Sequence, residues 1–448
     1  MRSVPVSLLF LVGGFGLSAG LLLLAMFAPL AALGALPAAV ILLMALMLYE
    51  FPLAAAALLV GSLGLALDLQ LDTMASSGFA GGAGTLGAAV VKLIPYALAA
   101  VLVLRYGFSA VIPWTFLAFT AIAAISIVVL PMGRVADTGE MIRSYIGSVA
   151  PFVLTLAHAP RHVWAWICKA VIFIPLISAG MSVFTWVVGF YPSFDMNWRF
   201  QGLHSAPFLA GFCLTAIFAA TLEYLRTFKS RWLILGGAVM AVLLASQARA
   251  PMAAVVLFLF CVLVFSSSRV FPAKRKVDLL MGGMLPALML FGPLVVLFLD
   301  RALDGALGGG GMNLSGRDVI WPYFLQAIEA RPLFGYGLGA GKLIVDPLDP
   351  QIRLIQSNAA HNEYLRLSVD AGIVGCALII GSIIAWIWGG TRRVAPADRL
   401  VLRCALLGVL LHTGFDNTLI ATTAAALFPW FTAALARARA EAARPGHR

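Results

Sequence analysis

Charged residues are scarce in this sequence: Asp, Glu, Lys and Arg make up 11% of the 448 residues, whereas hydrophobic residues make up 62%. A soluble domain carries roughly a quarter charged residues, so the composition excludes an ordinary soluble protein and indicates an integral membrane protein. The five cysteines lie in or beside apolar runs, and none has the spacing of a zinc site or a disulfide framework. We therefore expect them to be packing residues within the lipid bilayer.

Motifs that bind nucleotides or metal ions are also missing. The sequence has no P-loop, no HExxH and no DxD pair of the kind that holds a metal on a nucleotide sugar. The net charge of +11 does not indicate nucleic acid, because the basic residues recur as short clusters between apolar segments. We therefore expect no metal, no cofactor and no nucleic-acid partner, and a cytosolic nucleotide donor is disfavoured.

Long apolar runs dominate the chain instead, and a transmembrane helix needs about 20 such residues. They predict an all-α polytopic membrane protein with about 12 transmembrane helices, 11 to 14 being allowed, and with an uncleaved first helix. The candidate spans lie near residues 6–26, 30–49, 51–68, 89–104, 109–130, 145–157, 167–190, 205–223, 232–247, 252–268, 279–300, 364–389, 400–416 and 418–436. The segment 145–157 is short enough to be re-entrant.

The basic clusters predict the orientation of these helices. Connections such as 226–231, 269–276 and 392–399, together with the tail 437–448, are rich in Lys and Arg, whereas the loop 69–88 has none. The positive-inside rule then places both termini in the cytoplasm. The predicted organisation is a membrane bundle over residues 1–300, a large extracytoplasmic loop over 301–363, and C-terminal membrane helices with a basic tail over 364–448.

The long loop contains a predicted helix of its own. Ser315 is a plausible N-cap, and an apolar stripe follows before Arg331 and Pro332. The stripe consists of Ile320, Tyr323, Phe324, Ala327 and Ile328. Such an amphipathic helix would lie along the membrane surface or cover a cavity. Loops of this length are usually functional or disordered.

Three polar residues on the extracytoplasmic side are candidates for chemistry. Each also has a purely structural interpretation: Arg249 as a snorkelling arginine, Arg317 as a charge on a helix surface, and His361 as a capping or interfacial histidine. We expect His361 in the first turns of a helix, on one face with Leu365 and Gly372. Together they favour a lipid-pyrophosphate substrate, because arginine binds phosphate oxygens and histidine accepts a proton near neutral pH.

At these residues the chain resembles the O-antigen ligase family, which includes O-antigen and exopolysaccharide polymerases. The family hallmark is His, then Asn, Ser or Gln, nine residues and Gly, and here it reads His361, Asn362 and Gly372. The family's loop pattern is also matched, by Gly316-Arg317, Trp321, Pro332 and Gly335-Tyr336-Gly337. Its Ser-Arg motif is matched loosely, because Gln247 and Ala248 separate Ser246 from Arg249.

The resemblance implies a GT-C-type membrane glycosyltransferase in the bacterial inner membrane, with its active site facing the periplasm. His361 would be the general base, and Arg317 and Arg249 would bind the pyrophosphate of an undecaprenyl-diphosphate-linked glycan. Asn362, Glu363, Trp321 and Tyr336 are possible supporting residues. Glu363 is a rival base, although on a helix only one of His361 and Glu363 can face the site. Inverting, metal-independent transfer is expected.

Two functions share this donor chemistry. One is ligation of a finished glycan onto lipid A-core, and the other is polymerisation, with a second lipid-linked glycan as acceptor. A chain-length regulator or a flippase is a possible partner in either case. A polysaccharide transporter or flippase is the alternative from another class, but its expected repeat symmetry and mid-membrane charges are not evident.

Overall fold

The computed structural model describes residues 52–66, 94–109, 114–128, 135–136, 138–195, 198–268, 270, 272–279, 317–346, 349–350, 352, 359–420 and 422–443. Within these ranges every regular element is a helix, and the only strand-like pairings are the isolated bridges Phe108–Ala157 and Phe194–Phe200. The predicted all-helical class is therefore confirmed for the described part of the chain. The predicted spans 6–26, 30–49 and almost all of 279–300 lie outside it.

The helices follow one another closely along the chain. In order they are α3 (Pro52–Gly64), α6 (Ile94–Tyr106), α7 (Trp114–Val128), α8 (Thr138–Val149), η1 (Ala150–Leu156), α9 (Arg161–Ala170), α10 (Phe173–Val187), α11 (Ala206–Thr227), α12 (Ser230–Ser246), α13 (Arg249–Phe265), α14 (Ala273–Leu279), α16 (Arg317–Ala330), η3 (Ala340–Lys342), α18 (Glu363–Gly390), α19 (Pro396–Thr413) and α20 (Ala424–Ala442). Here η marks a 3₁₀-helix.

Three described segments are long and apolar enough to cross a membrane: Arg161–Val187, Ala206–Thr227 and Glu363–Gly390. Shorter apolar helices occupy Pro95–Tyr106, Trp114–Val128, Ser230–Ser246 and Arg249–Phe265. These lengths and compositions are those of a membrane protein. The total of about 12 spans stays a prediction.

Proline explains two departures from the predicted spans. In the predicted span 145–157, the α-helix α8 starts earlier, at Thr138, and changes to the 3₁₀-helix η1 at Ala150, next to Pro151. The predicted span 167–190 begins earlier, at Arg161, and is interrupted between α9 and α10, just before Pro175. In both places the proline has no N–H to continue the helical hydrogen-bond ladder.

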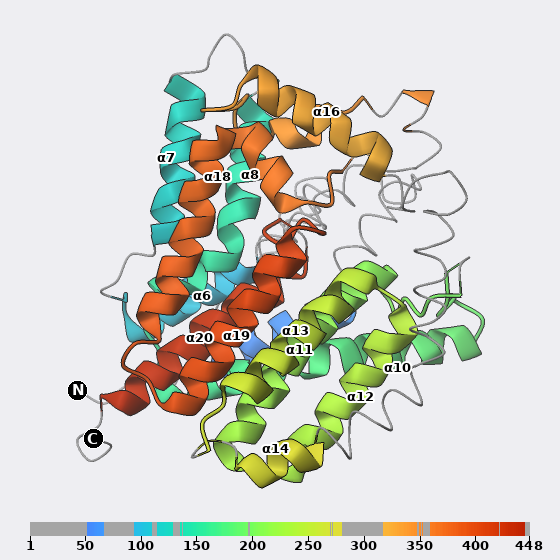
Figure 1. Cartoon of the computed structure of the whole chain (residues 1–448), viewed down its shortest axis with the longest axis vertical. Coiled ribbons are helices and arrows are strands. Elements are labelled where there is room, and N and C mark those ends of the chain that lie inside the picture. Colours follow the sequence, from blue (N-terminus) through green and yellow to red (C-terminus); the bar gives the residue numbers. More distant parts are fainter. Residues whose placement is uncertain are drawn as a thin grey trace, which may run out of the picture.

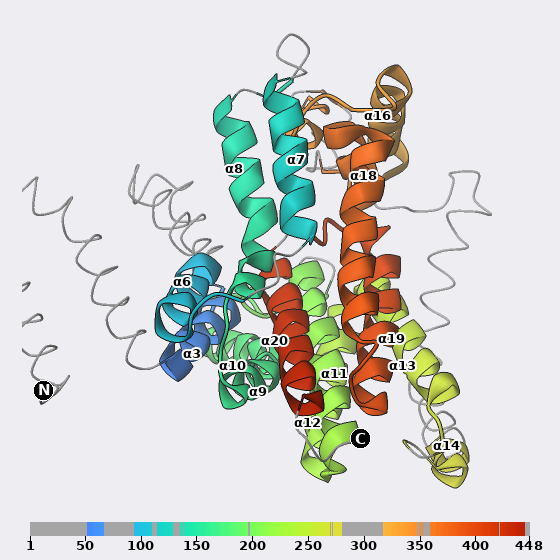
Figure 2. The same cartoon turned by 90° about the vertical axis from the view of Figure 1, so that its left-hand side faces the viewer.

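The helices form two neighbouring groups (Figures 1 and 2). α7, α8 and α18 run side by side, and α16 packs against α18 at the end where α18 begins. α11, α12, α13, α19 and α20 pack together below them in Figure 1. α18 thus reaches from α16 at one end to the helical bundle at the other.

α11 forms the centre of the second group, because nearly all of its side chains are buried. Phe218 on this helix lies 4.5 Å from Phe258 of α13 and 5.9 Å from Trp430 of α20, measured between ring centroids. α19 approaches α13 closely at Gly408, where an added Cβ would lie 3.0 Å from the Ala254 carbonyl oxygen. Small residues at such crossings are how apolar helices pack within lipid.

Candidate active site

Each of the two predicted arginines lies at the start of a helix. Arg317 is the first residue of α16, and Arg249 is the first residue of α13. The two residues interposed in the Ser-Arg motif form the turn before α13: Gln247 ends α12 with φ 51°, and Ala248 is the N-cap of α13. Free backbone N–H groups and the helix dipole make such starts favourable for an anion.

His361 lies just outside α18 rather than in its first turn. The helix begins at Glu363, and its N-cap is Asn362, whose side-chain oxygen accepts a hydrogen bond from the Leu365 backbone N–H at 3.2 Å. The expectation that His361 shares a helix face with Leu365 and Gly372 is therefore wrong. His361 instead has φ 45°, an uncommon backbone conformation for a residue other than glycine. Its side chain is 42% exposed, so it is accessible to a substrate.

Trp321 anchors the chain immediately before this histidine. Its indole Nε1–H donates a hydrogen bond to the carbonyl of the buried Ala360 at 2.8 Å. Trp321 lies on α16, one turn after Arg317, so one helix carries both a candidate phosphate ligand and a support for His361. This contact gives the predicted supporting residue Trp321 a positioning role.

Asp416, in the connection between α19 and α20, faces His361. One Asp416 carboxylate oxygen lies 3.8 Å from His361 Nδ1, and the other lies 3.5 Å from His412 Nε2 near the end of α19. Burial works to raise the pKa of the Asp416 carboxyl. The His361 and His412 imidazoles and the Asn417 backbone N–H, which donates at 2.8 Å, outweigh burial and hold this pKa below its ordinary value.

Sequence reasoning missed Asp416 and His412. Both lie about 50 residues after His361, at the end of a different helix, so spacing within one motif does not reveal them. A signal was nevertheless present in the stretch HTGFDN, residues 412–417, where two titratable side chains follow the apolar run of α19. Intramembrane or membrane-edge titratable residues are by default candidates for function.

Arg317 joins the same group of residues. One of its terminal nitrogens donates a hydrogen bond to the Phe415 carbonyl at 2.8 Å, next to Asp416. Burial lowers the pKa of Arg317, the Asp416 carboxylate opposes this effect, and the positive charge of Arg249 adds to it. The arginine remains charged at neutral pH. Arg249 and Asp416 therefore each lie within electrostatic range of Arg317.

We call Arg249, Arg317, His361, His412 and Asp416 the histidine cluster. It contains two permanently charged arginines and a single carboxylate, which also contacts both histidines. Arg317 Nε is buried and has no hydrogen-bond partner among the described residues. A buried donor without a partner is costly, so Arg317 Nε is able to take a further hydrogen-bond acceptor.

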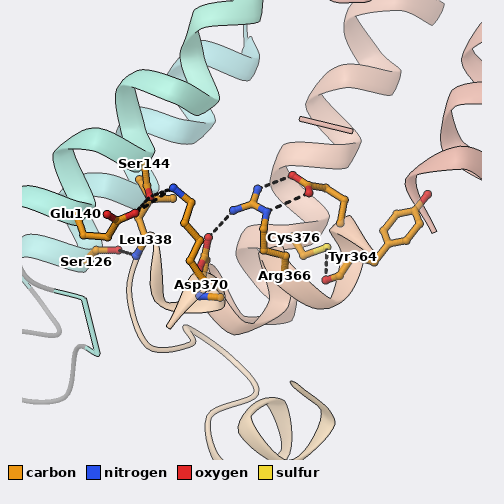
Figure 3. Close-up of polar contacts among 11 residues, drawn as sticks. Ser126, Glu140, Ser144, Leu338, Tyr364, Arg366, Asp370 and Cys376 are labelled. Carbon is orange, nitrogen blue, oxygen red and sulfur yellow. Dashed lines mark hydrogen bonds and ion pairs between the residues drawn. The ribbon is translucent and has the colours of Figure 1, made fainter. Parts of the chain in front are cut away.

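Glu363, the rival base, is turned into the protein toward Arg366, which Figure 3 shows beside Asp370. Glu363 is fully buried, and both of its carboxylate oxygens accept hydrogen bonds from Arg366, one of them at 3.0 Å. Arg366 also donates to Asp370 at 2.6 Å, and Asp370 accepts the Gly341 backbone N–H at 2.6 Å. Glu363 is therefore held in a buried ion-pair network, whereas His361 is exposed.

The motif glycines hold the loop against α18. Gly372 interrupts the helix with φ 70° and ψ 177°, a conformation that is essentially restricted to glycine. The loop satisfies the backbone groups around this break: Tyr336 N–H donates to the Val369 carbonyl, and Ile373 N–H donates to the Pro332 carbonyl. A Cβ at Gly335 would lie 2.4 Å from the Val369 oxygen, so glycine is required there as well.

Other residues of the loop attach it to α7 and α8 (Figure 3). Lys342 pairs with Glu140 and with Ser144, each at 3.0 Å, and the Leu338 backbone N–H donates to Ser126 at 3.1 Å. The ring of the predicted supporting residue Tyr336 lies 4.8 Å from the Arg331 guanidinium. These contacts make the loop a folded part of the protein that fixes the start of α18.

The histidine cluster does not bring the usual metal-ligand set together. No group of three or more His, Cys, Asp or Glu residues that could hold a metal ion is found in the described part of the chain. Metal-independent transfer and the absence of a cofactor stay predictions.

The helical architecture and the apolar segments define an α-helical membrane protein. Residues 233–380 match the family model described as O-antigen ligase, which confirms the predicted resemblance to the O-antigen ligase family. The match runs from the first turn of α12 into α18 and contains Arg249, Arg317 and His361. No curated protein matches the chain.

Proposed function

We propose that the protein is a membrane glycosyltransferase that transfers a glycan from an undecaprenyl-diphosphate-linked donor to an acceptor hydroxyl at the periplasmic face of the bacterial inner membrane. The carrying observation is the grouping of the histidine cluster, where two arginines, each the first residue of a helix, lie near an exposed histidine that faces Asp416. Arginine forks and helix starts both favour the oxygens of a pyrophosphate.

The proposed reaction uses these residues in distinct roles. Arg317 and Arg249 bind the pyrophosphate oxygens, whose charge increases as the sugar departs. His361 accepts the proton of the acceptor hydroxyl while that oxygen forms a bond to the anomeric carbon. The bond from this carbon to the pyrophosphate oxygen breaks with inversion, and undecaprenyl diphosphate leaves with the bonding electrons. Asp416 stabilises the resulting imidazolium, as its position 3.8 Å from His361 Nδ1 permits.

Ligation onto lipid A-core is the preferred reaction, and polymerisation of lipid-linked repeat units is the alternative. Both need the same donor site, so the acceptor distinguishes them. A glycan profile of a deletion strain separates the two: loss of surface polymer with accumulation of long lipid-linked chains indicates a ligase. Accumulation of single lipid-linked repeats indicates a polymerase.

His361→Ala tests the proposed base in a transfer assay with purified protein, a polyprenyl-diphosphate-linked glycan and the acceptor. General-base catalysis contributes roughly 10²–10⁴-fold, so the rate should fall by about that factor. His162→Ala is the matched control, because His162 is an exposed histidine on α9, outside the histidine cluster. A rate near that of the wild type for His361→Ala, with normal folding, would rule out this role for His361.

A further inference from the structure

A second positively charged region lies at the far end of α18. A cavity of about 1150 Å³ is found between the α18–α19 turn and the end of α20. Its lining includes Arg392, Arg393 and Arg439, with Glu441 as the single carboxylate among the described lining residues. The candidate active site lies at the opposite end of α18, so this cavity is a separate feature.

The length of α18 places the cavity at a membrane surface. Beyond the break at Gly372 the helix continues from Ile373 to Gly390. At about 1.5 Å per residue this part is roughly 27 Å long, close to the thickness of the bilayer hydrocarbon core. Trp388 lies near its end, where its ring stacks with the Arg403 guanidinium at 4.1 Å. Tryptophan is enriched at this depth, so the cavity is at headgroup level.

The single carboxylate of the cavity is already engaged by other arginines. Glu441 pairs with Arg161 at 2.6 Å and also accepts a hydrogen bond from Arg226. Among the described residues, Arg392 and Arg393 form no ion pair with an acidic side chain, and both are exposed. Arg439 donates only a weak hydrogen bond, at 3.3 Å, to the Gly390 carbonyl. Three guanidinium groups therefore line the cavity without a carboxylate to match them.

A smaller cavity adjoins this charged cavity. It has a volume of about 70 Å³, and Arg439 lines both cavities. Its lining is mixed: Trp164, Trp386 and Leu435 are apolar, and Ser109, Thr155 and Thr432 carry hydroxyl groups. Arginine can keep its charged end in a polar space while its stem lies along apolar side chains. The two cavities together suit a ligand with an anionic head and an apolar part.

We propose that this cavity binds the phosphate headgroup of an anionic phospholipid from the leaflet opposite the candidate active site, which the positive-inside rule identifies as the cytoplasmic leaflet. Arginine forks bind phosphate oxygens in pairs of hydrogen bonds, and basic pockets between membrane helices on this side recognise anionic headgroups. The lipid is favoured over free phosphate because the cavity lies at headgroup depth, at the end of a helix long enough to cross the membrane. This inference does not depend on the proposed glycosyl transfer.

The test compares phosphatidylglycerol with phosphatidylcholine as bound lipid, measured by native mass spectrometry of the purified full chain. Wild type should retain phosphatidylglycerol preferentially. The double variant R392Q/R393Q should bind it about 30-fold more weakly, as each arginine near the membrane surface contributes roughly a factor of five. The control K274Q/R275Q removes two exposed positive charges from α14, outside the cavity, and should retain wild-type binding.

Gly390→Ala provides a second variant that keeps every charge. Its Cβ would lie 2.6 Å from an Arg439 terminal nitrogen, so the guanidinium must move. Weaker phosphatidylglycerol retention in this variant, with an unchanged melting temperature in phosphatidylcholine nanodiscs, supports the site. If R392Q/R393Q and K274Q/R275Q lost phosphatidylglycerol binding equally, the proposed site would be overturned, because the positive charge of the surface as a whole would then explain the binding. Equal stabilisation by inorganic phosphate in detergent without phospholipid would overturn it in favour of a soluble anion.

Discussion

Two clusters of charged residues lie at opposite ends of α19 and differ in their balance. The histidine cluster has two arginines and one carboxylate. The other cluster, which we call the arginine–carboxylate cluster, has three arginines and three carboxylates. It consists of Arg161, Glu223, Arg226, Asp398, Arg437 and Glu441. Its contacts join α9, α11, α19 and α20.

The balance of charge explains what each cluster does. In the arginine–carboxylate cluster every arginine contacts a carboxylate: Arg226 pairs with Asp398 at 2.9 Å, and Arg437 pairs with the fully buried Glu223. Such a set is balanced in charge. The histidine cluster instead groups two arginines and two histidines around Asp416. We propose that the balanced cluster supports the structure and that the histidine cluster binds an anion.

The largest effect on stability is expected from Arg437→Met. This change leaves the Glu223 carboxylate buried without its main partner, which should destabilise the fold by about 3–5 kcal/mol. The fraction of folded chain after heating in detergent measures the loss, and turnover per folded molecule should stay unchanged. E223L/R437M removes both charges and should recover most of the stability. A double variant as unstable as the single one would contradict this account.

A smaller effect, on rate and pH dependence, is expected from Asp416→Asn. The pKa of Asp416 lies below its ordinary value, so this carboxylate is charged between about pH 5 and 8 and favours protonated histidine beside it. Without it, the imidazolium formed during transfer loses its stabilising charge, and the maximal rate should fall about tenfold between about pH 5 and 8. The gap between variant and wild type should narrow at lower pH, where Asp416 of the wild type becomes protonated. Equal rates for the two at neutral pH would exclude contact between Asp416 and the base during catalysis.

The smallest effect is expected from Trp321→Phe. This change removes the hydrogen bond to the Ala360 carbonyl, worth about 1 kcal/mol, and should lower the transfer rate a few-fold through a less ordered His361. Trp198→Phe is the control, because Trp198 is 79% exposed. Steady-state kinetics of both variants measure the difference. Equal rates for the two would show that Trp321 has only a general packing role.

Local patterns predicted much of this arrangement. The apolar stripe from Ile320 to Ile328 predicted α16, which ends at Ala330 as expected before Arg331, and its buried side chains are Ile320, Phe324 and Ala327. The chemistry of arginine and histidine singled out Arg249, Arg317 and His361, and all three belong to the histidine cluster. Each of these inferences uses residue type and helical spacing, which the sequence contains directly.

Other features depend on contacts between distant segments and could not be predicted. His361 was expected in the first turns of a helix, whereas α18 begins after it with Asn362 as its N-cap, since the Trp321–Ala360 hydrogen bond holds the chain just before this point. The non-helical Gly372 depends on the loop docking against it. Asp416 reaches His361 only because α19 and α18 pack together.

The central claim is that the two arginines of the histidine cluster bind a pyrophosphate and that His361 does not. Binding of a polyprenyl diphosphate without a glycan, measured by microscale thermophoresis on the purified protein, tests it most directly. Arg317→Ala should weaken binding about 100-fold, and Arg317→Lys should also weaken it, because a fork becomes a point charge. His361→Ala should bind as the wild type does. Wild-type affinity in both Arg317 variants, or an equal loss in His361→Ala, would contradict the claim.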